Sequence, residues 1–323
     1  MSSNILSLLE IRNTLTATIG ISFMVIGTIG GLLNILLFAR RRMWNLSPCI
    51  PYMFATTVAN MFNLYTSVLI RVLYGFKFTF MLYFSAPCKL QYYSAYTLVC
   101  ISSWLMAACC ADRFIASSRD ADIRCYSSMR IAYRVIFSII VIVIVAASEV
   151  FFCIDANQIN APGPCYTTSP TCVIIDQFYV FIFQIIGPPM CMIVFGIGTY
   201  IHIRQGQKVR STDAHTKTVE ATHVAGAIGD EHTRGKNRAV LRMLFAQILV
   251  YIACTCPYST FRLYAVMTAT VIKSNERLVI ENIILNIAIL IQFIDKTFAF
   301  FIYTLTSAYF RQELIKLFKR RNI

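Results

Sequence analysis

The sequence predicts an all-α membrane protein, built as a seven-transmembrane helix bundle with a short amphipathic C-terminal helix. Hydrophobic residues make up 57% of the 323 residues, whereas soluble domains contain roughly 45–50%. Charged residues make up only 14%, although about 25% is usual. The third observation is a set of seven apolar runs, and a helix needs about 20 apolar residues to cross a bilayer. A mean hydropathy of +0.64 therefore excludes a soluble enzyme and a disordered chain.

The seven runs are predicted to be helices because strands of a membrane barrel have only about 10 residues. The fourth run, 135–154, contains Glu149, and the seventh, 282–310, contains the adjacent pair Asp295 and Lys296. The other five contain no Asp, Glu, Lys or Arg, and they span 14–39, 43–70, 90–111, 177–203 and 243–261.

The 29 Lys and Arg residues predict the orientation of these helices. Segments after the first, third, fifth and seventh runs carry 21 of them, against six on the opposite side. Basic residues are enriched on the cytoplasmic side of membrane proteins. We therefore expect residues 1–13 to form an extracellular N-terminus, 14–306 the transmembrane domain, and 307–323 a cytoplasmic amphipathic helix and tail.

The C-terminal segment 307–323 has apolar side chains near helical spacing, with basic residues between them. We expect this helix to lie on the inner leaflet, where its cations meet anionic lipid. The alternative is a frayed basic tail. Because the net charge of +14 is distributed in short blocks beside apolar runs, we expect membrane lipid as a partner and no nucleic acid. The apolar positions are Tyr309, Phe310, Leu314, Ile315, Leu317 and Phe318.

Short motifs follow the seven runs in a fixed order. Cys88 precedes the third run, Asp112-Arg113-Phe114 closes it, and Pro257 lies in the sixth. In order and spacing these motifs resemble the rhodopsin-like (class A) G protein-coupled receptors, most closely the peptide-type and orphan members. Further matching positions are Asn34, Ser102, Trp104, Cys254, Tyr303, Ser307, Phe310 and Arg311.

This resemblance implies a plasma-membrane receptor that binds an extracellular ligand and activates a heterotrimeric G protein. Such a receptor is not an enzyme, and we expect neither a cofactor nor a metal. Its work is the coupling of two distant sites through a two-state helix bundle.

The resemblance also assigns the coupling and switch residues, which are Asp112, Arg113, Phe114, Pro257 and Tyr303. An arginine presents five donors in a rigid fork, which suits a neighbouring carboxylate or the carbonyls of an inserted helix. The alternative for Arg113 is an ordinary capping or snorkelling pair. Pro257 interrupts helix hydrogen bonding, so it is either a static bend or the hinge of an outward swing.

The resemblance implies that Cys88 forms a disulfide in the second outer loop. Cys165 and Cys172 are both available as partners. We favour Cys165, because Pro188 lies near the middle of the fifth helix and a bond at Cys172 leaves little chain to reach it. Most of the 12 cysteines lie inside the runs, where cysteine acts as a small apolar residue.

The ligand class follows from the residues near the outer ends of the runs. Ala95 stands where amine receptors carry an acid, seven residues after Cys88, so a cationic amine loses its usual partner. Cations and aromatic residues in a polar mouth favour a peptide, with Arg71 or Arg262 meeting a carboxylate or amide end. Lipid and odorant ligands remain open. The candidate ligand-binding residues are Arg71, Gln91, Tyr92, Tyr96, Arg262, Glu281 and Gln292.

Several positions depart from the family pattern and define the alternatives. Thr255 replaces the usual tryptophan of the sixth helix, and Ala299 begins the altered seventh-helix motif. These changes suggest a non-signalling seven-helix membrane protein as one alternative. A retinal-based or other seven-helix transporter is the second, with Lys296 as its possible retinal lysine. Lys236 and Arg238 supply cations where many members carry an acid, which predicts raised ligand-free signalling.

Overall fold

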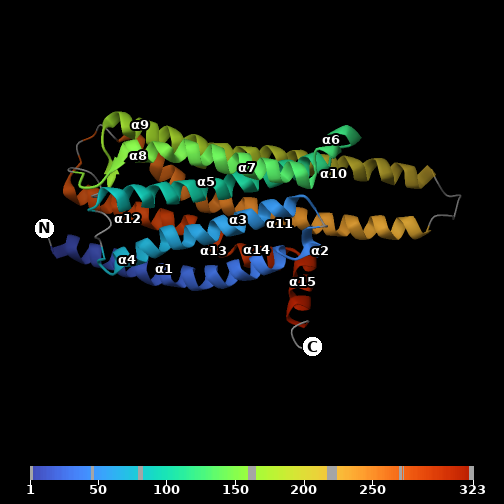
Figure 1. The fold of residues 1–323 in the computed structure, drawn as a ribbon, viewed down its shortest axis with the longest axis horizontal. Helices are drawn as coiled ribbons and strands as arrows, with labels where there is room; N and C mark the ends of the chain where they lie inside the picture. The colour runs from blue at the N-terminus through green and yellow to red at the C-terminus, as the bar shows by residue number, and fades with distance from the viewer. Residues whose placement is uncertain are drawn as a thin grey trace.

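A computed structural model describes residues 3–44, 47–78, 83–158, 165–216, 224–268, 271 and 273–319. Within them the chain forms a bundle of helices along one long axis (Figure 1). Seven helical segments are long and apolar enough to cross a membrane, as the seven runs predict. These segments are Leu9–Phe38, Cys49–Gly75, Ser85–Ala116, Met129–Cys153, Pro170–Gln205, Arg242–Met267 and Glu276–Thr297.

The first four spans are built from helices that differ in regularity. The first and third are continuous, whereas the second contains a π-helical segment, η1, and the fourth a 3₁₀ turn, η3. Their elements are α1 (Ser3–Phe38), α2 (Arg41–Trp44), α3 (Cys49–Asn63), η1 (Leu64–Val68), α4 (Leu69–Gly75), α5 (Ser85–Ala116), α6 (Ala121–Cys125), α7 (Met129–Ala146), η3 (Ala147–Glu149) and α8 (Val150–Cys153).

The remaining elements are a two-stranded ribbon, three further spans and the C-terminal helix. The fifth span contains a second π-helical segment, η4, and the seventh is divided at Phe293 and Phe298. The elements are β1 (Ile154–Asp155), β2 (Tyr166–Thr167), α9 (Pro170–Tyr179), η4 (Val180–Ile186), α10 (Gly187–Thr216), α11 (Val224–Met267), α12 (Asn275–Gln292), α13 (Ile294–Thr297), α14 (Ala299–Thr306) and α15 (Ala308–Lys319).

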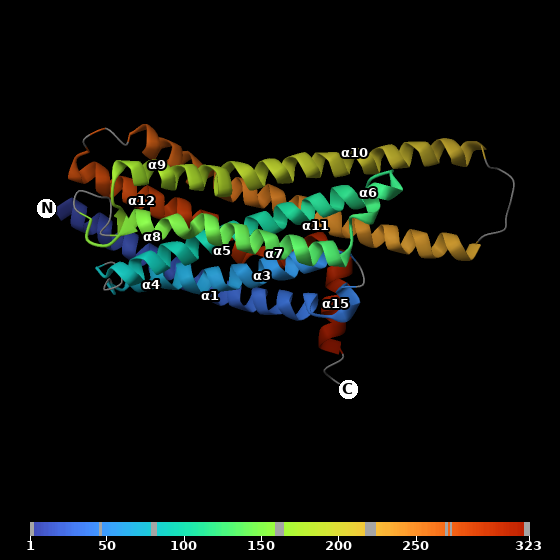
Figure 2. The ribbon, with the colours of Figure 1, turned by 45° about the horizontal axis from the view of Figure 1, so that its top comes forward.

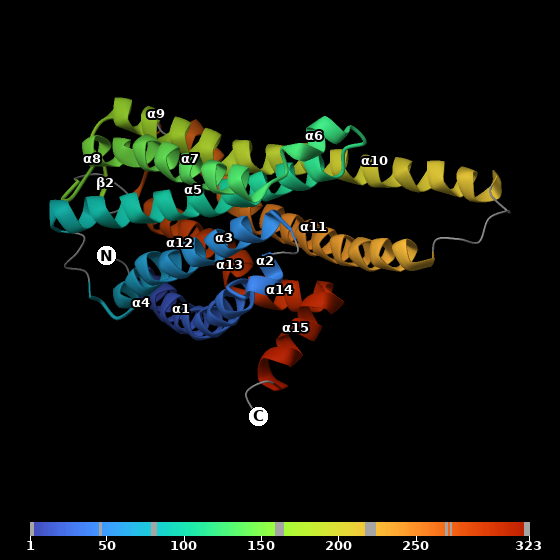
Figure 3. The same ribbon diagram turned by 45° about the vertical axis from the view of Figure 1, so that its right-hand side comes forward.

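The two ends of the bundle carry different features. The N-terminus, α8, α9 and the ribbon lie at one end, which we call the outer end (Figures 1 and 3). At the opposite, inner end α10 and α11 extend beyond the other helices, and α15 runs across the bundle axis (Figure 2). The predicted amphipathic helix is thus a separate element, in which Phe310 and Glu313 are each only 1% exposed.

The first helix begins eleven residues earlier than the predicted start of the span at residue 14. Residues 3–13 contain neither glycine nor proline, so nothing in this stretch interrupts a helix. Consequently Arg12 and Asn13, expected in an extracellular tail, occupy helical positions.

Prolines in the fifth span leave carbonyl groups that other helices satisfy. In the π-helical segment the Gly187 N–H donates to the Ile182 carbonyl, five residues back. Pro188 and Pro189 have no N–H, so in this register the carbonyls of Phe183 and Gln184 lack a donor from their own helix. Trp104 Nε1 of α5 donates to the Phe183 carbonyl at 3.0 Å, and the Tyr251 hydroxyl of α11 donates to the Gln184 carbonyl at 3.3 Å. These two bonds join the third, fifth and sixth spans near the middle of the bundle.

The outer ribbon is held to the helices by disulfides. Ile154 pairs with Thr167 and Asp155 with Tyr166 in antiparallel register. Cys88 of α5 is bonded to Cys165, whereas Cys172 is bonded to Cys153. Hydrogen bonds from the Ser85 hydroxyl and the Ala156 N–H lower the pKa of the Asp155 carboxyl.

A third disulfide lies toward the inner end. It joins Cys49, the first residue of α3, to Cys109 of α5, and both cysteines are fully buried. For these two residues the expectation of small apolar side chains is wrong, because the close packing of α3 on α5 brings their sulfur atoms together.

Candidate functional site

An open cavity of about 480 Å³ lies at the outer end of the bundle. Volumes of roughly 300–1,000 Å³ are usual for ligand pockets. The lining mixes cations, tyrosines and amides from six spans with the ribbon. It consists of Arg12, Asn13, Thr16, Arg71, Tyr74, Gly75, Lys77, Gln91, Tyr92, Ala95, Tyr96, Ile154, Cys165, Tyr166, Thr167, Asp176, Tyr258, Arg262, Asn282, Leu285, Asn286 and Ile289.

Most of the ligand-binding residues expected from the sequence meet in this cavity. Its lining includes Arg71, Gln91, Tyr92, Tyr96 and Arg262.

Glu281 and Gln292 do not line the cavity. The Glu281 carboxylate accepts hydrogen bonds from Lys273 Nζ at 2.7 Å and from Arg277 Nε at 3.0 Å, which hold it at the start of the seventh span. Gln292 lies three residues beyond Ile289, the deepest lining residue of α12, and is buried. Both residues were expected to bind the ligand, whereas the structure places them on α12 outside the cavity lining.

Arg262 forms an ion pair with Asp176 across the cavity. Its Nη2 lies 2.8 Å from Asp176 Oδ2, and the two side chains are 12% and 4% exposed. The guanidinium also lies over the Tyr258 ring, 5.9 Å from its centroid. A carboxylate and an aromatic face thus already balance the charge of Arg262.

Arg71 has no carboxylate partner among the described residues. Its Nη1 donates to Asn286 Oδ1 at 3.0 Å, and Asn286 Nδ2 donates to Asn282 Oδ1 at 2.8 Å. Arg12 Nη1 donates to the same Asn282 oxygen at 2.8 Å. Two guanidinium groups are therefore connected through two neutral amides.

Tyrosines form the floor and one wall of the cavity. Tyr92 packs edge-on against Tyr96, and Tyr96 stacks on Tyr179 with ring centroids 5.8 Å apart. Burial raises the pKa of Tyr166 in the ribbon, so its phenol stays a hydrogen-bond donor at neutral pH. This wall suits an apolar or aromatic part of a ligand.

The motif that closes the third span lies at the inner end. Arg113 Nε donates to Asp112 Oδ2 at 3.1 Å, and the two residues are 8% and 7% exposed. The Ser127 hydroxyl donates to the other Asp112 oxygen at 2.7 Å. Phe114 stacks on His202 of α10, with ring centroids 4.8 Å apart. Asp112 therefore links Arg113 to the segment that follows α6.

The other expected switch residues lie in the sixth and seventh spans. Tyr303 is 1% exposed, with Phe38 and Phe310 against its ring. Pro257 lies inside α11, which continues through it. The side chains of Lys236 and Arg238 lie outside the described part of the chain.

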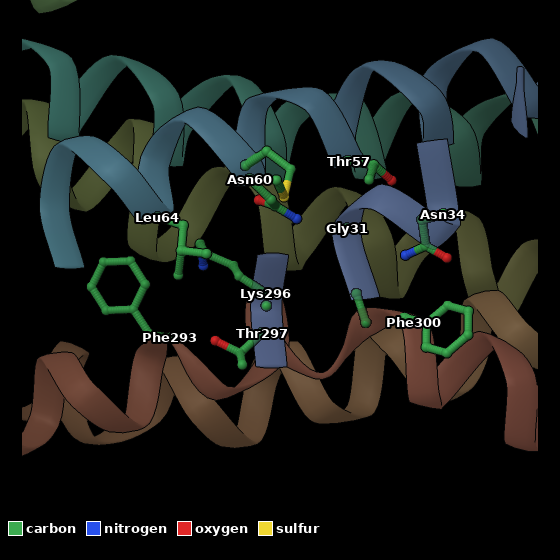
Figure 4. A pocket seen from close by; sticks show the side chains of 12 residues that line it. Gly31, Asn34, Thr57, Asn60, Leu64, Phe293, Lys296, Thr297 and Phe300 are labelled. Atoms are coloured by element: carbon green, nitrogen blue, oxygen red, sulfur yellow. The ribbon is translucent and has the colours of Figure 1, made fainter. Parts of the chain in front are cut away.

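A second, smaller pocket surrounds Lys296 in the centre of the bundle (Figure 4). Its volume of about 20 Å³ is close to that of a single water, and Asn34, Asn60 and Thr297 supply polar groups. Lys296 Nζ lies 3.0 Å from Asp295 Oδ1. Lys296 does not line the outer cavity, and this pocket has no room for a retinal.

The sequence did not predict several residues of the cavity lining. Asn282, Leu285, Asn286 and Ile289 recur at helical spacing, so this pattern was a usable signal for one face of the seventh span. Arg12 gave no such signal, because it stands 270 residues from the amide that it contacts.

The chain matches a known protein family. A family model described as 7 transmembrane receptor (rhodopsin family) matches residues 30–303, which is most of the chain. The search of curated proteins gave no match.

Proposed function

Because this chain belongs to the rhodopsin family of seven-transmembrane receptors, we propose that it binds an extracellular ligand in its outer cavity and activates a heterotrimeric G protein at its inner end. In a plasma membrane, the outer end faces the exterior and α15 lies along the cytoplasmic leaflet. The receptor then performs no bond chemistry, and ligand binding shifts the bundle between two states.

The arrangement of Arg113 carries this proposal. Its guanidinium lies at the inner end of the third span, and its Nε and Nη2 donate to the adjacent Asp112 carboxylate. Since a guanidinium has five donors, breaking this local pair frees a rigid fork for the carbonyls of an incoming helix. A cavity at one end and this releasable arginine at the other are the two sites that a receptor must couple.

A peptide is the ligand class that the cavity favours. Cations, amides and stacked tyrosines line an opening wide enough for several side chains. Polar groups that fix orientation beside aromatic surface are typical of such sites. A peptide meets both kinds of surface with its backbone and its side chains.

Nucleotide exchange tests G protein activation without knowledge of the ligand. The purified receptor, in lipid nanodiscs, is mixed with heterotrimers of each Gα class, and release of GDP is measured. We expect ligand-free acceleration by the wild type and its loss in Arg113→Ala. Arg130→Ala is the matched control, because Arg130 is an exposed cation at the same end. A folded wild-type receptor that accelerates exchange on no heterotrimer would contradict the proposal.

The two alternatives predict different outcomes. A non-signalling membrane protein gives no exchange with any variant. A retinal-based transporter develops a visible absorbance band after addition of retinal, which depends on Lys296. We expect no such band, because the pocket at Lys296 holds only about 20 Å³.

A further inference from the structure

Charge is distributed unevenly over the outer cavity. Arginine and lysine side chains contribute four cations to its lining, and Asp176 is its only carboxylate among the described residues. That carboxylate already pairs with Arg262 on the α9 and α11 side. The opposite side, formed by α1, α4 and α12, contains Arg12 and Arg71, and none of the described lining residues there is an acid.

We propose that the Arg12–Asn282–Asn286–Arg71 chain is an anion subsite that binds a carboxylate group of the ligand. This inference rests on the proposed function, since it takes the outer cavity as the ligand site. It narrows the ligand from any peptide or lipid to one with a free acid group.

The first support is the unbalanced charge. A cation removed from water is costly unless an anion or a set of hydrogen bonds compensates it. Arg71 is half-buried, and among the described residues its side-chain hydrogen bond goes to the neutral amide of Asn286. An anionic ligand group supplies the missing compensation, which the Asp176 carboxylate already provides for Arg262.

The second support is the donor geometry. The amide oxygens of Asn282 and Asn286 each accept from a guanidinium, so they fix Arg12 and Arg71 without neutralising them. Nε and Nη2 of Arg12 also donate to Asn13 Oδ1, at 3.1 and 2.7 Å, so Arg12 keeps fewer donors than Arg71. The guanidinium of Arg71 keeps a fork of N–H donors, and a carboxylate accepts two parallel bonds from such a fork. Tyr92 and Tyr258 line the same cavity and carry hydroxyl donors.

The carboxylate has two possible sources, a peptide C-terminus and a fatty acid. Matched probes distinguish them. One pair is a mixture of N-acetylated tripeptides with free C-termini and the same mixture with C-terminal amides. The other pair is oleic acid and oleyl alcohol. Binding to the purified receptor in nanodiscs is measured by the shift in its unfolding temperature over a concentration series.

We expect one acid to bind roughly ten- to a hundredfold more tightly than its neutral partner. Arg71→Gln should abolish this preference. Asn286→Asp should abolish the preference too, because the new carboxylate neutralises Arg71. This second variant tests the inference if Arg71→Gln fails to fold. Arg277→Gln is the control, since Arg277 binds Glu281 outside the cavity lining; it should retain the preference.

Three results would overturn the inference: no shift with either acid, equal shifts with acid and neutral probe, or a preference that survives in both Arg71→Gln and Asn286→Asp. Nucleotide exchange is read separately on the same preparations. A receptor that accelerates exchange without acid preference keeps the proposed function and loses the anion subsite. A receptor that prefers the acid but does not accelerate exchange keeps the anion subsite and loses the proposed activation of a G protein.

Discussion

Arg262 and Arg71 show how one residue type takes two roles in one cavity. Both arginines line the cavity. The sequence predicts equally for each that it contacts an acid group of the ligand. Asp176, 86 residues from Arg262, neutralises it, whereas the partner of Arg71 is an amide. The two arginines differ in the residue that each contacts. Because these contacts depend on helix packing, the sequence alone does not distinguish the two arginines.

The Arg262–Asp176 pair should be a strong structural contact. With Asp176 4% exposed, Asp176→Asn leaves a buried guanidinium without its anion, and we expect a loss of about 3 kcal/mol in the free energy of unfolding. The double variant Asp176→Asn/Arg262→Gln should recover part of that loss, because neither charge is then stranded. A double-mutant cycle from denaturation of the purified receptor measures the coupling. Purely additive effects would show that the two charges do not interact.

At the scale of elements, the fifth span depends on its neighbours for hydrogen bonding. The Pro188-Pro189 pair removes two N–H donors, and the π-helical segment η4 precedes it. Gly187 fits there because a Cβ would lie 2.8 Å from the Trp104 ring. The irregular segment is therefore complete only when the third and sixth spans pack on it.

Tyr251→Phe tests this dependence. The change removes the hydroxyl that donates to the Gln184 carbonyl and retains the ring. We expect the free energy of unfolding to fall by about 1–2 kcal/mol, because a buried carbonyl loses its partner. Tyr133→Phe is the control, since Tyr133 is 50% exposed, and it should change stability by less than about 0.5 kcal/mol. Equal effects of the two changes would contradict this role of the hydroxyl.

The sequence predicts the spans better than their contacts. Hydropathy locates all seven, because the bilayer sets the length and polarity of each helix separately. The run at 177–203 with its prolines also indicates an irregular fifth helix. The partners of that irregular segment, Trp104 and Tyr251, come from other helices. Pairs such as Arg12 with Asn282 likewise depend on how helices pack, which local periodicity does not encode.

At the scale of the whole molecule, the two ends differ in their chemistry. The outer end has the Cys88–Cys165 and Cys153–Cys172 disulfides around the cavity. The inner end has Arg113, and the sequence segments after the first, third, fifth and seventh runs carry 21 of the 29 Lys and Arg residues. Disulfides persist in oxidising surroundings, and basic loops stay in the cytosol. The two disulfides of the outer end and the basic segments predict the same orientation. The third disulfide, Cys49–Cys109, lies toward the inner end and is fully buried between α3 and α5, so the basic residues are the stronger of the two indications.

Cysteine labelling in intact cells tests this orientation. Cys125 in α6 is free and exposed at the inner end, so a membrane-impermeant maleimide should label it only after permeabilisation. In the Cys125→Ser background this label should disappear. Tyr83 is 54% exposed at the outer end, and Tyr83→Cys in that background should react in intact cells. Labelling of Cys125 in intact cells would show that the bundle has the opposite orientation in the membrane. The cavity would then face the cytosol, and Arg113 would lie where no G protein reaches it.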